Sequence, residues 1–320
     1  MAAGSGVDVV PTVGPPIGAG IRPRPRGWWP VRSPRSPGRR ALLFCAPALV
    51  VYTTFMVWPL LQSLRFALAD SAGDWVGLDN FDTLFFDDRW SERFWRALRQ
   101  NLQFFLFHCL VQNPVGLLLA ALLTVQRLGG ANVYRTLIFV PTTLSVVIVG
   151  FAWRLILSPL WGIVSTPLLG RTSTALPTLS LISVWQWIGI PMIFFYATLI
   201  SIPQELIDAS RVDGASAWRT FWRVSFPLVL PMFGVITIVT YIANMNAFDL
   251  VFTVQGVQAG PSSSTDLLGT LFYRSAYGSV QGGGDRAMGA TVASATFGVI
   301  LLGLLVFFLV WRRRVRTYQL

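Results

Sequence analysis

The stretch ELIDASRVDGASAWRTF, from Glu205 to Phe221, is polar and charged in a chain that is otherwise mostly hydrophobic. Pro203, just before it, favours the start of a helix because its φ suits the first helical turn. Apolar residues then recur at helical spacing, namely Leu206, Ala209 and Val212. Gly214 predicts a bend with a positive φ, and a second helical run is expected from about Ser216. The segment is therefore expected to form two short helices at an angle, with an apolar face that lipid does not cover.

The composition around this segment is that of a polytopic membrane protein. Of 320 residues, 53% are hydrophobic and only 12% are charged, whereas soluble domains carry about 25% charged residues. A bilayer crossing needs about 20 predominantly apolar residues. Six stretches meet this requirement: 41–64, 101–125, 134–157, 178–200, 224–245 and 288–311. The sequence predicts an all-α fold with six transmembrane helices, and kinks are expected at the prolines inside them, Pro47, Pro59, Pro114, Pro141, Pro191 and Pro231.

The arginines predict the orientation, because positively charged loops tend to stay in the cytoplasm. With both termini inside, the inner segments hold 16 arginines against four acids, and the outer segments hold nine against ten. Residues 1–40, rich in proline, glycine and arginine, are expected to be a disordered cytoplasmic tail, and 313–320 a cytoplasmic C-terminal tail. Membrane topology thus accounts for the net charge of +11, and nucleic acid is not an expected partner.

The energy source is expected to lie outside this chain. Self-sufficient secondary carriers need intramembrane ionisable groups to carry the coupling ion. The candidates here are His108 and Asp249, and a lone histidine is more often a structural hydrogen bonder. A membrane-embedded enzyme would need clustered acids, histidines or cysteines near one membrane face, and the sequence shows none. No catalytic or metal site is therefore predicted.

The polar segment has a simpler interpretation, as an amphipathic helix lying on the membrane surface. Against it stand the bent, two-part pattern and the acids Glu205, Asp208 and Asp213, which an anionic inner leaflet would repel. A groove on a soluble partner would suit such a segment better.

A resemblance to a known family follows from this region. DASRVDGASAWRTFWRVSFPLVLP, Asp208 to Pro231, resembles the EAA loop of permease subunits of binding-protein-dependent ABC importers. The family's Asp-Gly-Ala and aromatic-Pro-Leu elements are matched by Asp213-Gly214-Ala215 and Phe226-Pro227-Leu228. Asp208 stands where the family usually has Glu, and Ser210 where it has Ala; both changes are small.

Other stretches extend the resemblance to about residues 41–312, a six-span permease domain, and to the carbohydrate branch typified by maltose and glycerol-phosphate permeases. They are Trp58-Pro59-Leu60, WVGLDNFDTLF (Trp75 to Phe85), VWQWIG (Val184 to Gly189) and the stretch from Phe248 to Tyr277. In the last of these the glycines are spread compared with the family pattern, at Gly256 and Gly260, which predicts a loop of different shape. Another ABC importer branch remains the alternative.

The resemblance implies a type I importer permease whose segment of about 201–223 docks on a cytoplasmic ATPase. The residues implied are Glu205, Asp208, Ala209, Asp213, Gly214, Ala215, Trp218 and Phe221. Gly214 would set the angle between the helices, and Trp218 and Phe221 would pack the segment onto its own spans. The implied partners are a second homologous permease, an ABC ATPase dimer and an extracytoplasmic binding protein, in a bacterial cytoplasmic membrane. Because the chain has no GxxxxGK[ST] loop, ATP and Mg would be used by the ATPase, and this chain would bind no cofactor.

Carbohydrates are held by aromatic faces together with side-chain amides and hydroxyls. The candidates for the substrate path are Asn113, Trp185, Trp187, Asn244, Asn246 and Asp249. Tryptophans can equally be interfacial anchors, and asparagines can serve helix packing. Trp185 and Trp187 do not share a helix face, so at most one of them is expected to line a path. The loops 65–99 and 246–287 are long enough to meet the binding protein.

Overall fold

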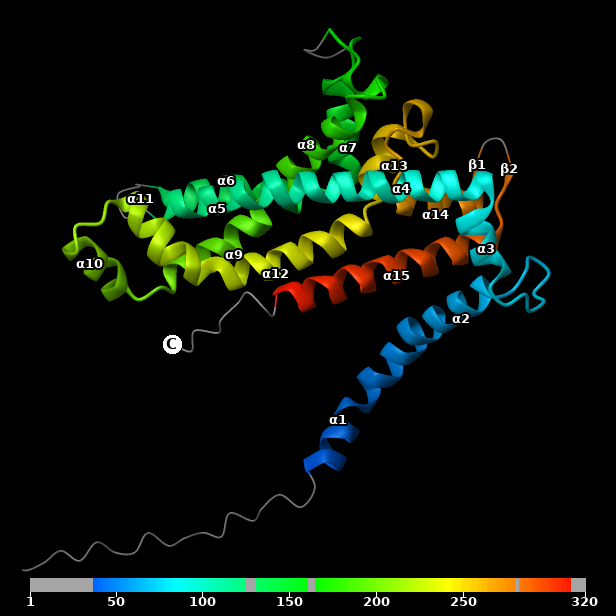
Figure 1. The fold of residues 1–320 in the computed structure, drawn as a ribbon, viewed down its shortest axis with the longest axis horizontal. Coiled ribbons are helices and arrows are strands. Elements are labelled where there is room, and N and C mark those ends of the chain that lie inside the picture. The colour runs from blue at the N-terminus through cyan, green and yellow to red at the C-terminus, as the bar shows by residue number, and fades with distance from the viewer. Residues whose placement is uncertain (1–36, 125–129, 161–164, 280–281, 312–320) are drawn as a thin grey trace, which may run out of the picture. The chain divides into compact units, whose positions relative to one another are not determined.

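The computed structural model describes residues 37–124, 130–160, 165–279 and 282–311, and the chain divides into two units, Met1–Phe55 and Met56–Leu320 (Figure 1). The predicted tail 313–320 lies outside the described residues, as does most of the predicted tail 1–40. Helix α1 (Pro37–Tyr52) begins inside that predicted tail, four residues before the expected boundary.

Among the described residues after α1, the regular elements are helices, apart from one pair of two-residue strands. The first part of the second unit contains α2 (Trp58–Ala67), α3 (Asp79–Phe86), α4 (Asp88–Phe107), α5 (Asn113–Leu123), α6 (Ala131–Thr143) and α7 (Val146–Ile156). Its middle part contains α8 (Ala175–Trp187), α9 (Gly189–Ile200), α10 (Gln204–Val212), α11 (Ala217–Thr220) and α12 (Phe226–Met245). After these come α13 (Asp249–Gln255), α14 (Leu268–Tyr277), the antiparallel strands β1 (Gly278–Ser279) and β2 (Gly282–Gly283), and α15 (Arg286–Trp311).

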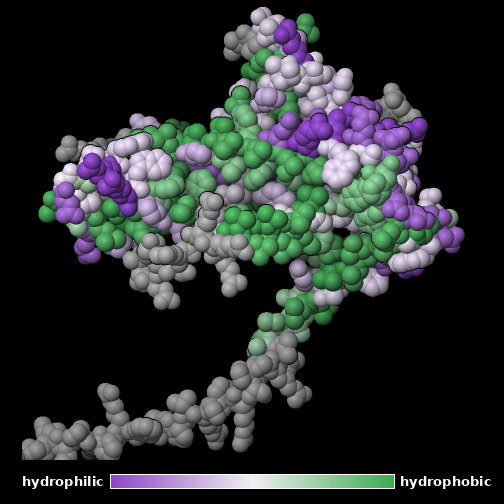
Figure 2. Space-filling model, viewed as in Figure 1, coloured by the Kyte–Doolittle hydropathy of each residue, from purple (hydrophilic) through white to green (hydrophobic). Residues whose placement is uncertain are grey.

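The predicted six-span, all-α fold is confirmed. Four continuous helical stretches are long and apolar enough to cross a membrane: Phe44–Ala67, Asp88–Leu123, Ala217–Met245 and Arg286–Trp311. Two further spans are bent pairs, α6 with α7 at 95° and α8 with α9 at 46°. Hydrophobic side chains cover the middle of the second unit, while hydrophilic ones gather at its two ends (Figure 2).

The third span bends sharply within the predicted stretch 134–157, close to Pro141, where a kink was expected. It is broken at Leu144 and Ser145, whose backbones are extended with ψ of 144° and 132°. Pro141 lies in the last turn of α6 and cannot donate a backbone hydrogen bond, which weakens the helix there. The side chain of Gln186 compensates by donating to the freed carbonyl of Leu144, at 3.1 Å. The break is thus held by a partner from the fourth span.

Not every proline kinks its helix. Two π-helical segments of the second unit, η2 (His108–Gln112) and η4 (Phe221–Ser225), end two residues before a proline, Pro114 and Pro227 respectively. A proline ring clashes with the carbonyl four residues before it, and the wider π turn gives that carbonyl room. The helices Asp88–Leu123 and Ala217–Met245 therefore continue past these prolines.

The helices approach closely where one of them offers a glycine. A side chain at Gly234 would overlap the indole of Trp311, and one at Gly303 would overlap the ring of Tyr241. The hydroxyl of Tyr241 in turn donates to the carbonyl of Val299 at 2.8 Å. Small residues at such contacts let membrane helices pack tightly, so α12 and α15 are joined along their length.

Candidate functional site

The segment Gln204–Ser225, called here the 204–225 segment, lies at one end of the second unit, opposite α3 and the β1–β2 hairpin (Figure 1). Its bend is a Schellman motif in which Gly214 has a φ of +76°. The backbone N–H of Gly214 donates to Arg211, and that of Ala215 donates to Ser210, both at 3.0 Å. The predicted bend at Gly214 is confirmed.

The second helix of the segment differs from the expectation of a short, separate element. Ser216 caps α11 by accepting the N–H of Arg219 at 3.3 Å, close to the predicted start. From Ala217 the helix then runs through η4 into α12 as far as Met245, without an intervening loop. The fifth span therefore begins seven residues before the predicted 224, and α11 is its first turn.

A hydroxyl pair ties the two helices of the segment together. Ser210 Oγ and Thr220 Oγ1 lie 2.9 Å apart, and Thr220 is buried. Phe221 packs against the apolar cluster around Leu117, Phe195 and Val229, as predicted. Trp218 is 71% exposed and its ring meets the edge of Trp222 on the same helix, so its predicted packing onto the spans is wrong.

The exposed side of the segment combines acids with apolar side chains. Asp208 accepts hydrogen bonds from Arg211 and Gln204, each at 3.1 Å, and its ion pair with Arg211 is solvent-exposed. Such a pair contributes little to stability. Other exposed residues of the segment include Glu205, Leu206, Ala209, Val212, Asp213 and Trp218, with Val212 at 88%, together with the basic residues Arg219 and Arg223. This surface contacts nothing within the described part of the chain that would explain its apolar residues.

A cavity of about 440 Å³ lies between α4 with η2, α8 with α9, α12 and the start of α13. Four of the six predicted substrate-path residues line it, and they come from three different elements of the chain: Trp187, Asn244, Asn246 and Asp249. The aromatic rings of Phe104, Phe194 and Phe248 form further parts of its wall. The cavity thus combines aromatic faces with a few amide and carboxylate groups.

The two other predicted residues lie outside the lining. Asn113 is fully buried behind the wall, where its Oδ1 accepts from Thr240 Oγ1 at 3.2 Å. Trp185 is 43% exposed, and its ring lies edge-on to that of Trp153, 5.6 Å away. Of the two tryptophans, Trp187 lines the cavity and Trp185 does not, in keeping with their different helix faces.

His108 lies in the cavity wall with both ring nitrogens hydrogen-bonded. Nδ1 lies 2.8 Å from the carbonyl of Phe104, and Nε2 lies 2.9 Å from Ser183 Oγ. A carbonyl only accepts, so Nδ1 carries the proton and Nε2 accepts from the Ser183 hydroxyl. His108 is thus a fully bonded structural residue. In the described ranges no group of three His, Cys, Asp or Glu residues is placed to hold a metal ion.

Sequence reasoning missed Ser183 and Gln112, which also line the cavity. Gln112 is buried, and its Oε1 has no hydrogen-bond partner among the described residues. The available signal was position: Gln112 precedes Asn113-Pro114, where a proline inside an apolar span predicts local widening of the helix.

The loop after α13 is held by a buried ion pair. Arg274 and Asp266 approach to 2.5 Å, Thr270 donates to Asp266 at 2.7 Å, and Arg274 also donates to the carbonyl of Val257 at 3.1 Å. Gly256 and Gly260 have φ values of +73° and +75°, so the spread glycines do shape this loop. Asn101 links it to the cavity, accepting from the N–H of Leu268 and donating to the carbonyl of Asn244.

Comparison with known proteins adds a family match. Residues 112–312 match the family described as binding-protein-dependent transport system inner membrane component. The probable starch degradation products transport system permease protein AmyD of Thermoanaerobacterium thermosulfurigenes is 30% identical over 271 residues, covering 81% of this chain and 89% of that protein. The multiple sugar-binding transport system permease protein MsmF of Streptococcus mutans is 28% identical, covering 80% and 91%. In fold, a chain of a bacterial ABC transporter involved in the import of the acidic polysaccharide alginate is similar, with a TM-score of 0.73, 23% identity and coverage of 87% and 97%.

Proposed function

Because this chain belongs to the binding-protein-dependent transport system inner membrane component family, we propose that it is the transmembrane permease subunit of an ATP-driven carbohydrate importer. The relatives named for starch degradation products and multiple sugars support the substrate class. The observation that carries the proposal is the exposed helix α10, which is tied to a helix continuous with a membrane span. A partner bound there can move the span.

The 204–225 segment is the proposed docking element for a cytoplasmic ATPase. The Schellman motif at Gly214 and the Ser210–Thr220 hydroxyl pair make α10 and α11 one unit. A side chain built at Gly214 would meet no atom within 4 Å, so the bend is open to a partner surface. Val212 and Trp218 would enter an apolar groove of that partner, and Asp208 and Asp213 would meet its donor groups.

The cavity is the proposed part of the translocation pathway, completed by a second homologous permease. Sugar rings have apolar C–H faces edged by hydroxyls, which suits a wall of aromatic rings with a few amides. Trp187 offers such a ring, and Asn244 and Asn246 offer side-chain oxygens. These roles are inferred from the chemistry of the lining.

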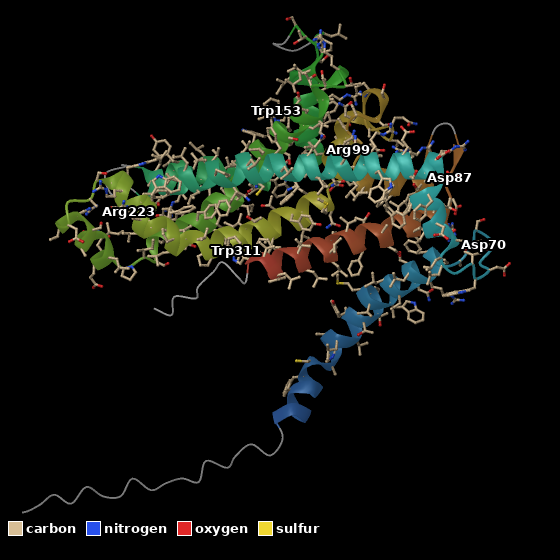
Figure 3. The ribbon with its side chains drawn as sticks, in the orientation of Figure 1. Asp70, Asp87, Arg99, Trp153, Arg223 and Trp311 are labelled. Carbon is tan, nitrogen blue, oxygen red and sulfur yellow. The ribbon has the colours of Figure 1, made fainter. Side chains whose placement is uncertain are left out.

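The proposed importer has further parts. The ATPase dimer would use ATP and Mg, and an extracytoplasmic binding protein would deliver substrate to the loops 65–99 and 246–287. Both termini would be cytoplasmic in a bacterial membrane, consistent with Arg223 at the 204–225 end and Asp70 and Asp87 at the opposite end (Figure 3). Lipid would surround the exposed apolar helix faces.

Co-purification from detergent tests this proposal. The chain is expressed with candidate ATPase and second-permease subunits, as the native sequence and as the double variant Asp208→Arg/Gly214→Asp. The charge-matched control is Gly73→Asp/Asp74→Arg, which makes the same pair of changes at exposed positions in the loop between α2 and α3. The native chain and the control are expected to retain both partners, and the double variant to lose the ATPase while keeping the second permease.

Two results would overturn the proposal. If the native chain retains no ATPase, the 204–225 segment is a membrane-surface helix, and the hypothesis of a self-sufficient carrier is favoured. If the double variant retains as much ATPase as the control, docking occurs elsewhere on the chain.

A further inference from the structure

Resting on the proposed function, we infer that the cavity selects neutral, hydroxyl-rich carbohydrates and rejects anionic ones. The relatives do not decide this question, because one structural neighbour belongs to an importer of an acidic polysaccharide and the sequence relatives named above are named for starch products and sugars. The argument comes from which polar atoms of the lining are already bonded and which remain open.

The side-chain NH2 groups of the two asparagines in the lining already donate hydrogen bonds within the protein. Asn244 Nδ2 donates to the carbonyl of Thr240 at 2.7 Å, and Asn246 Nδ2 donates to the carbonyl of Ile242 at 2.8 Å. A carbonyl accepts only, so each amide must place its nitrogen toward the helix backbone. The oxygen Oδ1 of each asparagine is the atom left for a solute.

The two hydroxyl groups of the lining also use their hydrogens within the protein. Ser183 donates to His108 Nε2, which is an acceptor because Nδ1 carries the proton. Thr240 donates to Asn113 Oδ1 at 3.2 Å. Each hydroxyl hydrogen is therefore used within the wall, and the oxygens offer lone pairs.

The charged groups of the lining also favour neutral solutes over anions. Asp249 lines the cavity, and the lining residues that the structure describes include no arginine. No described residue donates a side-chain hydrogen bond to the Asp249 carboxylate. Two neutral side-chain donors depart from the acceptor pattern: the indole N–H of Trp187 and the amide of Gln112, whose Oε1 has no hydrogen-bond partner among the described residues.

A neutral sugar and an anionic one should therefore behave differently in this cavity. Sugar hydroxyls donate to Asn244 Oδ1, Asn246 Oδ1 and Asp249, whereas a carboxylate or phosphate needs donors, preferably arginine. The Asp249 side chain is solvent-exposed, so at about 6 Å and an effective dielectric constant of about 40 it disfavours a substrate anion about tenfold.

Saturation-transfer difference NMR on the full permease–ATPase complex in nanodiscs tests the inference, without the binding protein so that its own selectivity is absent. The probes are maltotriose and trigalacturonate, which have the same number of rings and differ in charge. The native complex is expected to bind maltotriose at least tenfold more tightly. Asp249→Asn should reduce this ratio about tenfold, and Asp249→Arg should reverse the preference. Asp74→Asn, outside the lining, should leave the ratio unchanged.

The outcomes separate the inference from the proposed function. Equal binding of both probes, or a ratio unaffected by Asp249→Arg, overturns the charge selection while leaving a carbohydrate permease. Import of maltotriose by the complete system without detectable binding here also overturns it, because selection then resides in the binding protein. If no carbohydrate is imported and none stimulates the ATPase, the proposed function itself fails.

Discussion

Substitution of Gly214 gives the sharpest test of the 204–225 segment, because two nearly isosteric replacements separate backbone strain from contact with a partner. At a φ of +76° an ordinary L-residue costs about 1–2 kcal/mol, and Asn and Asp are the residues that tolerate this conformation best. Nothing in the described chain lies within 4 Å of a Cβ at this position. Gly214→Asn and Gly214→Asp should therefore fold alike and reach the membrane in equal amounts.

The two variants should differ once the ATPase is bound. An unpaired carboxylate buried in an interface costs about 3–5 kcal/mol, which is at least a hundredfold in affinity. Gly214→Asp is expected to abolish sugar-stimulated ATP hydrolysis and uptake in proteoliposomes, and Gly214→Asn to retain a substantial part of both. Gly214→Ala measures the strain alone.

The measurement is uptake of labelled sugar normalised to the amount of permease in the vesicles. Native uptake by Gly214→Asp would refute the docking role of the bend. Equal loss in Gly214→Ala and Gly214→Asp would show that backbone geometry matters and that close approach of a partner does not.

Three further predictions concern contacts inside the chain. Ser210→Ala and Thr220→Val should each lower the free energy of unfolding of the purified complex by about 1 kcal/mol, measured by thermal denaturation. The double variant should lose less than the sum of the two, because both residues share one hydrogen bond. Strict additivity would contradict the contact. Arg274→Met should destabilise the protein by about 3–5 kcal/mol because it leaves Asp266 buried and unpaired. Glu92→Gln, which breaks the exposed ion pair with Arg96, should cost under about 1 kcal/mol. A similar loss of stability in Arg274→Met and Glu92→Gln would refute the argument that burial makes the Arg274–Asp266 pair matter more. Gln186→Leu should cost about 1–3 kcal/mol by leaving the Leu144 carbonyl without its donor, and an unchanged melting temperature in detergent would show that the broken span is held in another way.

Sequence reasoning located the spans well because hydropathy over about 20 residues is a local property. The bend at Gly214 was equally local: a glycine after an amphipathic run favours a left-handed cap whatever lies around it. A kink of the third span could be read from Pro141, but the size of the bend, 95°, could not. The hydrogen bond that Gln186 donates to the Leu144 carbonyl comes from another span, and no local pattern reveals it.

In the 204–225 segment, too, some features could be predicted from the local sequence and others depended on the tertiary structure. Its helix starts and its polarity could be read from the sequence. Its continuity with α12 could not, because the predicted span began at 224 and no local pattern showed that α11 and the widened turn of η4 form one helix with it. Trp218 was misplaced because helical periodicity does not say which side of the helix another helix covers.

For the cavity, the residue types were predictable and their assembly was not. Trp187, Asn244, Asn246 and Asp249 were chosen for their chemistry, and the fold brings them to one wall, but it turns Trp185 away and places Asn113 behind Thr240. The acceptor character of that wall is a tertiary property, since it depends on the donor bonds that Asn244, Asn246 and Ser183 make.

By itself, the sequence determined that this is a six-span helical membrane protein with a polar, bent segment outside the lipid, because span length, charge distribution and glycine conformation depend on neighbours along the chain. Only the tertiary structure decided where the third span breaks, which residues face the cavity and which of their atoms remain free to bind a solute. These depend on hydrogen bonds between residues as far apart as His108 and Ser183, and a linear pattern carries no information about such pairs.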